Sequence, residues 1–160
     1  KLNEVDLKKV SIFLLNEIEG GQITGMTDPE DVLAKMREMF PHAKIVLTLG
    51  KDGAKYAEGD VTYHQPIFKV QAVDTTAAGD TFAGYFVSLV AYGRDFSEAI
   101  KTASAASALT VSKKGAAPSI PVISEVENAL DFLTSYSYDE SEREKQKKDI
   151  LKYIDETTII

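Results

Sequence analysis

Two short, uninterrupted apolar runs separated by helix-forming sequence are the feature that most limits how this chain can fold. Val10–Leu15 (VSIFLL) and Lys44–Leu49 (KIVLTL) are typical of strands buried on both faces, as in a parallel sheet. Between them, Asp28 and Pro29 have the order of a helix start, with an acid at the cap and proline at the first helical position. Strands that alternate with helices in this way indicate a layered α/β fold.

The rest of the chain adds a small hairpin and further helices. We expect a hairpin from Ala54–Ala57 and Val61–Gln65, and helices at 16–25, from Thr81 to about Tyr92, from Ser97 to about Ser112, and from a capping box at Ser124–Glu127 to about Leu133. Residues 1–134 would form this domain. Residues 135–160 predict a charged helical extension that becomes amphipathic.

Composition excludes several classes of protein. The 160 residues suit one ordinary domain, and the net charge of −7 argues against a nucleic-acid partner. Without cysteine, thiolate nucleophiles and Cys-based metal sites are excluded, and the two histidines lack a common metal-binding spacing. No apolar run approaches the ~18 residues of a membrane span, and no signal peptide opens the chain. We therefore expect a soluble, cytoplasmic domain without a membrane partner.

Both ends of the chain suggest a part of a longer protein. Lys1 stands where a cytoplasmic protein normally has Met or a small residue, and Ile160 ends an apolar run. An artificial boundary explains these ends equally well. In either case, the function to be judged is that of a part.

The segment Asp74–Asp80 (DTTAAGD), which leads directly into an apolar helix, is the most informative motif. Small residues let the backbone approach a ligand, and the first N–H groups of a helix lack internal partners. Ala77, Ala78 and Gly79 thus predict an anion site. A carboxylate beside a bound phosphate, as at Asp80, suits general-base activation of a hydroxyl. A plain helix start with a capping acid remains open as the alternative.

Four motifs in the same order resemble the ribokinase-like (pfkB) sugar kinase family. They are Asn16-Glu17-Ile18-Glu19, Thr48-Leu49-Gly50-Lys51-Asp52-Gly53, Val73–Phe82 and Lys113–Ser119. The resemblance covers Leu2–Leu133 and implies the C-terminal half of a layered α/β/α ribokinase-like fold. It also implies an enzyme that transfers the γ-phosphoryl group of ATP to a sugar hydroxyl.

The resemblance implies a role for each matched residue. Asp80 would take the proton of the attacking hydroxyl, and the N–H groups of Ala77, Ala78 and Gly79 would form the anion hole. Asn16 and Glu19 would organise Mg²⁺ and its waters; the alternative is a helix cap and an exposed acid. The residues implied to line the nucleotide are Thr48, Gly50, Gly53 and Ser104. For the turn Thr48–Gly53, an ordinary strand-to-hairpin turn is the alternative.

The resemblance further implies a monovalent cation, usually K⁺, beside the anion hole. The matching positions are Asp74, Thr76, Thr110, Lys113, Gly115 and Ser119. Several would contribute backbone carbonyls, so a lysine at 113 is no obstacle. A turn capped by Asp and Ser would have the same sequence.

Some positions depart from the family pattern. Ser104 stands where an Asn near the adenine is usual, Tyr85 where Ala or Gly is expected, and Leu15 where Pro is common. The family's N-terminal half, with most sugar contacts, has no counterpart here. We expect the parent protein to phosphorylate a primary hydroxyl of a pentose such as ribose. Another acceptor (fructose, a nucleoside or a sugar acid) and a non-catalytic nucleotide-binding or assembly module remain as rivals. Severed sheet edges also predict that the isolated chain self-associates or forms a homo-oligomer.

Overall fold

The computed structural model describes residues 7–135, which fall into two compact units. The first unit ends at Ile67 and the second begins at Phe68. The predicted helical extension beyond Ser135 lies outside the described residues. Within the described part of the chain, no helix is both long and apolar enough to cross a membrane.

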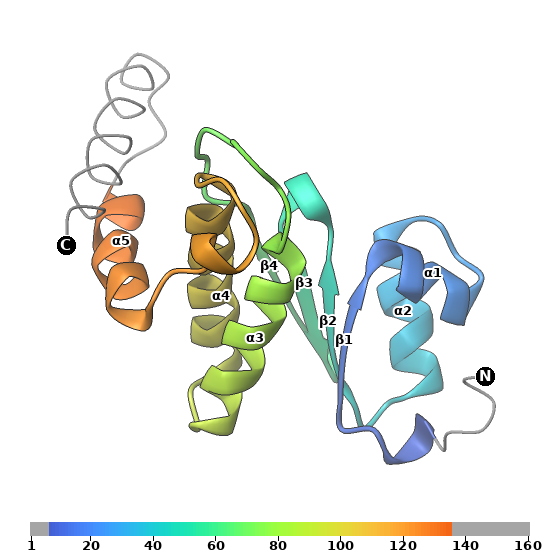
Figure 1. Cartoon of the computed structure of the whole chain (residues 1–160). Helices are drawn as coiled ribbons and strands as arrows, with labels where there is room; N and C mark the ends of the chain where they lie inside the picture. The colour runs from blue at the N-terminus through green and yellow to red at the C-terminus, as the bar shows by residue number, and fades with distance from the viewer. Residues whose placement is uncertain (1–6, 136–160) are drawn as a thin grey trace. The chain divides into compact units, whose positions relative to one another are not determined.

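The first unit is a four-stranded mixed sheet with two helices (Figure 1). Its elements are η2 (Leu7–Lys9), β1 (Ile12–Asn16), α1 (Glu17–Thr24), α2 (Pro29–Met39), β2 (Lys44–Thr48), η3 (Gly50–Asp52), β3 (Ala54–Glu58) and β4 (Val61–Gln65). The strand order is β1-β2-β3-β4, with β1 parallel to β2 and the hairpin strands antiparallel. The two apolar runs, the intervening helices and the hairpin are therefore confirmed.

Helices α1 and α2 lie on one side of this sheet (Figure 1). Every second residue of a strand faces these helices. Phe13 of β1 and its neighbour Ile45 of β2 thus join Met36 of α2 in one buried cluster. The rings of Phe13 and Phe40 are 4.7 Å apart between centroids. Pro29 stands at the start of α2, and the Asp28 side chain accepts hydrogen bonds from the next N–H groups, as the sequence predicts. This core fixes the ends of β1 and β2.

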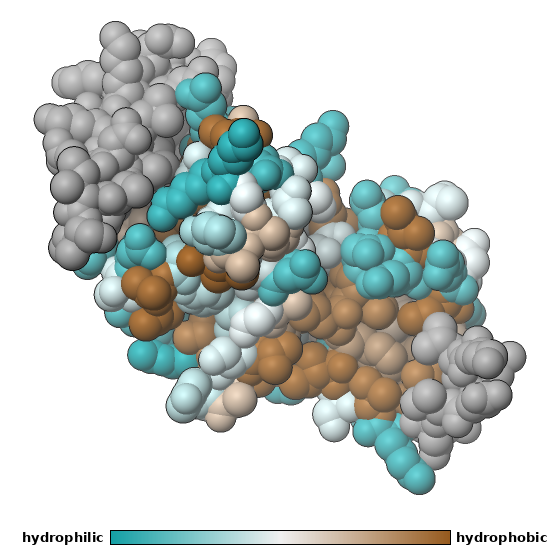
Figure 2. All heavy atoms as spheres, in the orientation of Figure 1, coloured by the Kyte–Doolittle hydropathy of each residue, from teal (hydrophilic) through white to brown (hydrophobic). Residues whose placement is uncertain are grey.

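One edge of β1 has no partner strand among the described residues, because β1 pairs only with β2. Its Ile12 is 36% exposed, and Figure 2 shows apolar surface at the position of β1. Apolar strand edges favour pairing with another chain. Self-association of the isolated chain stays a prediction.

The second unit is built from α3 (Ala78–Ala91), α4 (Phe96–Val111), η4 (Ala117–Ser119) and α5 (Ile123–Ser135). The buried alanines of α4, among them Ala99, Ala103 and Ala106, allow α3 and α5 to pack closely against it. Phe86 of α3 meets Phe96 of α4 edge to face, with ring centroids 5.6 Å apart. These contacts fix α3, whose N-terminus is the predicted anion site.

Three predicted helix starts need correction. Helix α3 begins at Ala78 rather than Thr81, since the turn residue Ala77 already opens it. Helix α4 begins one residue before Ser97, because the Asp95 side chain accepts from the Ser97 N–H group and caps the helix. The capping box at Ser124–Glu127 is wrong. Helix α5 starts at Ile123, and the Glu125 carboxylate accepts from the N–H group of the preceding Val122 at 2.7 Å.

Candidate functional site

The N-terminus of α3 has an unusual backbone. Ala77 has a φ of 65°, and no other non-glycine residue in the described part of the chain has a positive φ. The left-handed conformation costs an alanine roughly 1–2 kcal/mol, and such strain gathers at functional sites. No side chain caps this helix. The structure thus exposes a strained turn where the sequence predicts an anion site.

Two of the first three N–H groups of α3 are available to a ligand. The Ala78 N–H contacts the Thr75 carbonyl at a long 3.3 Å. Neither Gly79 nor Asp80 uses its N–H in a hydrogen bond with any described residue, and both residues are exposed. These donors and the positive end of the helix dipole suit a bound anion.

Asp80 is the third residue of α3, in its first turn. Its carboxylate forms no hydrogen bond or ion pair within residues 7–135. The alternative interpretation of Asp80 as a capping acid fails, since the cap position is Ala77 and no side-chain cap bond forms. The Asp80 carboxylate therefore lies unpaired, among the described residues, in the first turn of the helix that carries the predicted anion site.

Helix α4 holds this terminus in place. The Ser107 hydroxyl donates to the Ala78 carbonyl at 3.0 Å, and the buried hydroxyls of Thr110 and Thr81 lie 3.2 Å apart. Sequence reasoning missed Ser107, because a small polar residue in a helix gives no signal of its partner. The Thr110 hydroxyl also donates to the Ala106 carbonyl at 3.0 Å, and the Thr110 backbone oxygen accepts from the Ser112 and Lys113 N–H groups.

All the candidate cation residues belong to the second unit, and hydrogen bonds join Asp74, Thr76 and Gly115 directly. One oxygen of Asp74 accepts from the Thr76 N–H at 2.9 Å, and the other accepts from the Gly115 N–H at 3.0 Å. The N–H groups of Val73 and Asp74 both reach the Val111 carbonyl at the end of α4. Ser119 is fully buried, and its hydroxyl donates to the Ala116 carbonyl. Carboxylate and backbone oxygens of this kind fit a hard cation.

Among the described residues, no group of three or more His, Cys, Asp or Glu side chains could hold a metal ion. The candidate set for K⁺ instead combines one carboxylate with backbone carbonyl oxygens. Asp74 supplies that carboxylate, with one oxygen at the Thr76 N–H and the other at the Gly115 N–H, and oxygen donors of this kind fit K⁺.

Hydrogen bonds from Thr76, and then from Gly115, hold the pKa of Asp74 below its usual value. Because the folded pKa is lowered, ionised Asp74 stabilises the fold fully above the unfolded value of about 3.9, and this contribution disappears as pH falls through the folded pKa. We therefore expect Asp74→Asn to lower the free energy of unfolding at pH 7. Denaturant titrations from pH 7 to pH 2 should show the gap to wild type closing below about pH 4. A gap that persists unchanged in acid would contradict this expectation.

Asn16 and Glu19 form a reciprocal capping box at the start of α1. The Asn16 side chain accepts from the Glu19 N–H, and the Glu19 carboxylate accepts from the Asn16 N–H, both at 2.9 Å. The alternative interpretation of a helix cap is therefore realised. Asn16 also pairs in register with Thr48 at the carboxyl ends of parallel strands, where ligands bind in α/β sheets.

The turn Thr48–Gly53 connects β2 to the hairpin. Gly50 has a φ of 53° and open space around it. Gly53 has a φ of 91°, and an added Cβ would lie 2.1 Å from the Gln65 carbonyl oxygen. Gly53 is therefore required by the turn itself. Ser104, predicted to lie near the nucleotide, is buried on α4 in the second unit.

Comparison with known proteins identifies the class of protein that this fold and site belong to. The model of the pfkB family carbohydrate kinases matches residues 4–123. The chain belongs to this family, and its relatives are ribokinase-like.

A ribokinase from Staphylococcus aureus is 47% identical over 75% of this chain and 41% of its own length. The solved ribokinase of Arabidopsis thaliana, in complex with ribose and ATP, is 32% identical with a TM-score of 0.70, and the match covers 78% of this chain and 42% of that one. A putative ribokinase II from E. coli, in complex with ATP and Mg²⁺, is 26% identical with a TM-score of 0.71, over 78% and 40% of the two chains. The chain thus spans about 41% of the length of the first of these relatives.

Proposed function

We propose that this chain supplies the ATP-binding and phosphoryl-transfer part of a ribokinase-like sugar kinase. The acceptor would be a primary hydroxyl of a pentose such as ribose. One observation supports this above all: the Ala77 turn places unused N–H donors and the free carboxylate of Asp80 in the first turn of one helix. The ligands of the solved relatives, ribose, ATP and Mg²⁺, agree with it.

The proposed chemistry divides between acid–base work and charge stabilisation. The acceptor hydroxyl attacks the γ-phosphorus as its proton passes to Asp80; the new O–P bond forms, and the bond to the leaving ADP breaks. The N–H groups of Ala77, Ala78 and Gly79 stabilise the negative charge that develops. Mg²⁺, when bound, neutralises phosphate charge. Glu19 would hold its waters through the carboxylate oxygen that the capping bond leaves free, and Asn16 through the second lone pair of its Oδ1.

K⁺ would bind between Asp74–Thr76, here called the Asp74 turn, and the segment around Gly115. This cation would lie in the same unit as the anion site, so it would strengthen the positive field at the transferred phosphate. Thr76, Thr110, Lys113 and Ser119 are the other proposed ligands, mainly through backbone oxygens.

Two alternatives to this proposal lead to different experimental results: a module that binds nucleotide without catalysis, and a kinase of the same family with another acceptor. A module that only binds nucleotide would bind Mg-ATP without needing Asp80 in any later step. A kinase for fructose, a nucleoside or a sugar acid would keep every role above and change only the acceptor. A substrate panel with the complete kinase separates the acceptors.

The first experiment is calorimetric titration of Mg-ATP into the 160-residue chain, with and without K⁺. Saturable binding that strengthens with K⁺ would support the nucleotide and cation sites together. No binding at millimolar Mg-ATP would contradict a preformed site in this chain.

Gly79→Ala should separate ligand binding from folding. An added Cβ meets no atom within 4 Å, and alanine favours a helix over glycine by about 1 kcal/mol, so the variant should be at least as stable as wild type. The methyl group would occupy space needed for close approach of a phosphate. We expect Mg-ATP affinity to fall at least about tenfold, a change of about 1.4 kcal/mol.

Gly84→Ala is the matched control, because Gly84 lies in the same helix and its added Cβ also meets open space. It should gain similar stability and keep its Mg-ATP affinity. Equal affinities in the two variants would argue against an anion site at Gly79.

A further inference from the structure

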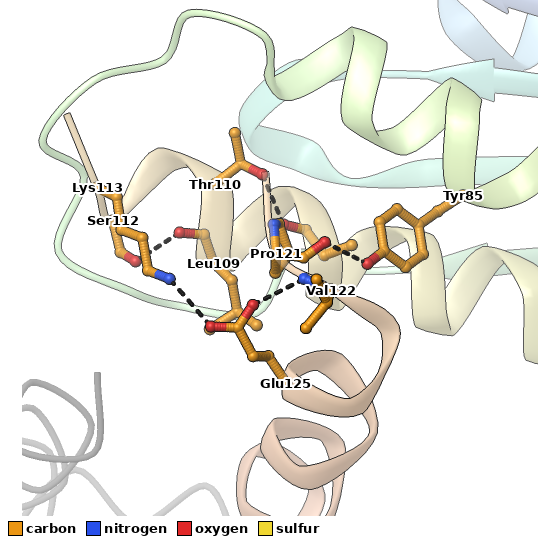
Figure 3. A network of polar contacts seen from close by, with 9 residues as sticks. Tyr85, Leu109, Thr110, Ser112, Lys113, Pro121, Val122 and Glu125 are labelled. Atoms are coloured by element: carbon orange, nitrogen blue, oxygen red, sulfur yellow. Dashed lines mark hydrogen bonds and ion pairs between the residues drawn. The ribbon is translucent and has the colours of Figure 1, made fainter. Parts of the chain in front are cut away.

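Tyr85 connects α3 to the loop that follows α4 (Figure 3). Its hydroxyl donates to the Pro121 carbonyl at 2.6 Å, across 36 residues of sequence. Its half-buried ring packs against a cluster formed by α4 and α5. The buried members of this cluster are Ala105, Ala106, Leu109, Val126 and Ala129. The ring and the hydroxyl therefore fix the end of residues 112–122, here called the α4–α5 loop.

Glu125 holds the same end of the loop from the other side. Its carboxylate accepts from the Val122 N–H at 2.7 Å and pairs with the Lys113 ammonium at 3.5 Å (Figure 3). The peptide between Pro121 and Val122 is thus fixed through both its carbonyl and its N–H group. Pairing with Glu125 also offsets the positive charge of Lys113, which would otherwise oppose a cation nearby.

The start and the middle of the loop are held as well. The Ser112 hydroxyl donates to the Leu109 carbonyl at 2.7 Å, and the Lys113 N–H reaches the Thr110 carbonyl at 3.2 Å. In the middle, the Gly115 N–H contacts Asp74 at 3.0 Å. The loop therefore contacts Asp74 through Gly115, and the position of its other end, at Pro121 and Val122, is held by Tyr85 and Glu125.

We propose that Tyr85 is a positioning residue, whose hydroxyl holds the α4–α5 loop with its oxygens beside the Asp74 turn. The inference rests on the proposed function, since those oxygens are the proposed cation ligands. The family pattern has Ala or Gly at this position, and neither could reach Pro121. Tyr85 is also five residues beyond Asp80 in α3, so the same helix bears the anion site and this anchor.

The Tyr85 hydroxyl stays protonated, and therefore stays a hydrogen-bond donor, at neutral pH. Burial, with a smaller contribution from the negative charge of Glu125, raises the pKa of Tyr85 above its usual value. The Pro121 carbonyl therefore keeps its hydrogen bond from Tyr85. If the Tyr85 hydroxyl is removed, the carbonyl of the buried Pro121 loses this donor.

Hydrogen exchange of residues 113–120 in the full chain tests the anchor directly. Tyr85→Phe keeps the ring and should speed exchange about fivefold, the factor expected for one lost hydrogen bond. Tyr92→Phe is the matched control, because Tyr92 follows the same helix and is 85% exposed. It should exchange like wild type. Equal rates in all three proteins would overturn the proposal.

Potassium titration of Mg-ATP binding tests positioning rather than mere structure. Tyr85→Phe should raise the K⁺ concentration for half-maximal enhancement about fivefold and leave the affinity at saturating K⁺ unchanged. A normal K⁺ response in Tyr85→Phe overturns the role of Tyr85 and leaves the proposed function intact. A wild-type chain that binds Mg-ATP without any K⁺ response overturns the cation site itself.

Discussion

Asp80→Asn should abolish turnover of the complete kinase and leave Mg-ATP binding nearly unchanged. The Asp80 carboxylate is exposed and unpaired within residues 7–135, so its replacement by an amide of the same shape removes no internal contact. A positioned base contributes about 10²–10⁴-fold to a rate. We expect kcat to fall at least about 10³-fold, and the Kd for Mg-ATP to change less than about threefold.

Asp31→Asn is a matched control for Asp80→Asn, because the two aspartates hold the same position in their helices. Asp31 is also exposed and is also the third residue of its helix, α2. Both substitutions remove a negative charge near a helix N-terminus, which costs roughly 0.3–1 kcal/mol of stability. Only Asp80→Asn should affect turnover. Steady-state kinetics with the complete kinase and thermal unfolding of the chain measure the two effects. Near-normal turnover of Asp80→Asn would exclude the proposed base.

Most of the fold could be predicted from the sequence because its signals are local. A short apolar run such as Val10–Leu15 indicates a buried strand whatever surrounds it, although β1 begins two residues later, at Ile12. Asp28 and Pro29 fix the start of α2 with no help from distant residues. The false capping box at Ser124 shows the limit of such patterns. Glu125, one residue further on, satisfies the Val122 N–H instead and starts α5 earlier.

The candidate site was only partly predictable, since its geometry depends on tertiary contacts. The motif Asp74–Asp80 indicates an anion site, yet nothing in the sequence shows that Ala77 adopts a left-handed conformation, which alanine normally avoids. The contact between Asp74 and Gly115 joins residues 41 positions apart. Tyr85 could be recognised as a departure from the family pattern, but its partner Pro121 could not be inferred.

Two glycines of the turn Thr48–Gly53 have different physical reasons to be glycine. Both have positive φ, a conformation that costs an L-residue roughly 1–2 kcal/mol. At Gly50 an added Cβ meets nothing within 4 Å. At Gly53 it would overlap the Gln65 backbone oxygen at 2.1 Å and approach the Pro66 Cα at 2.9 Å. Since both contacts are with backbone, no side-chain rotation relieves them.

Gly53→Ala should therefore cost at least about 3 kcal/mol, a large share of the 5–15 kcal/mol that stabilises an ordinary domain. The loss arises because Ala54 and Gln65 form the first pair of the β3–β4 hairpin, which must separate to admit the methyl group. Gly50→Ala, the matched control, should cost only the backbone strain of roughly 1–2 kcal/mol. Urea unfolding followed by circular dichroism measures both values.

The comparison also separates structure from binding in this turn. If Gly53 were glycine only to admit a nucleotide, Gly53→Ala would fold normally and lose Mg-ATP affinity alone. Equal stability losses at Gly50 and Gly53 would likewise contradict the clash with Gln65. Because Gly50→Ala keeps the hairpin pairing, a loss of Mg-ATP affinity in that variant would place the nucleotide at the exposed side of the turn, beside the carboxyl ends of β1 and β2.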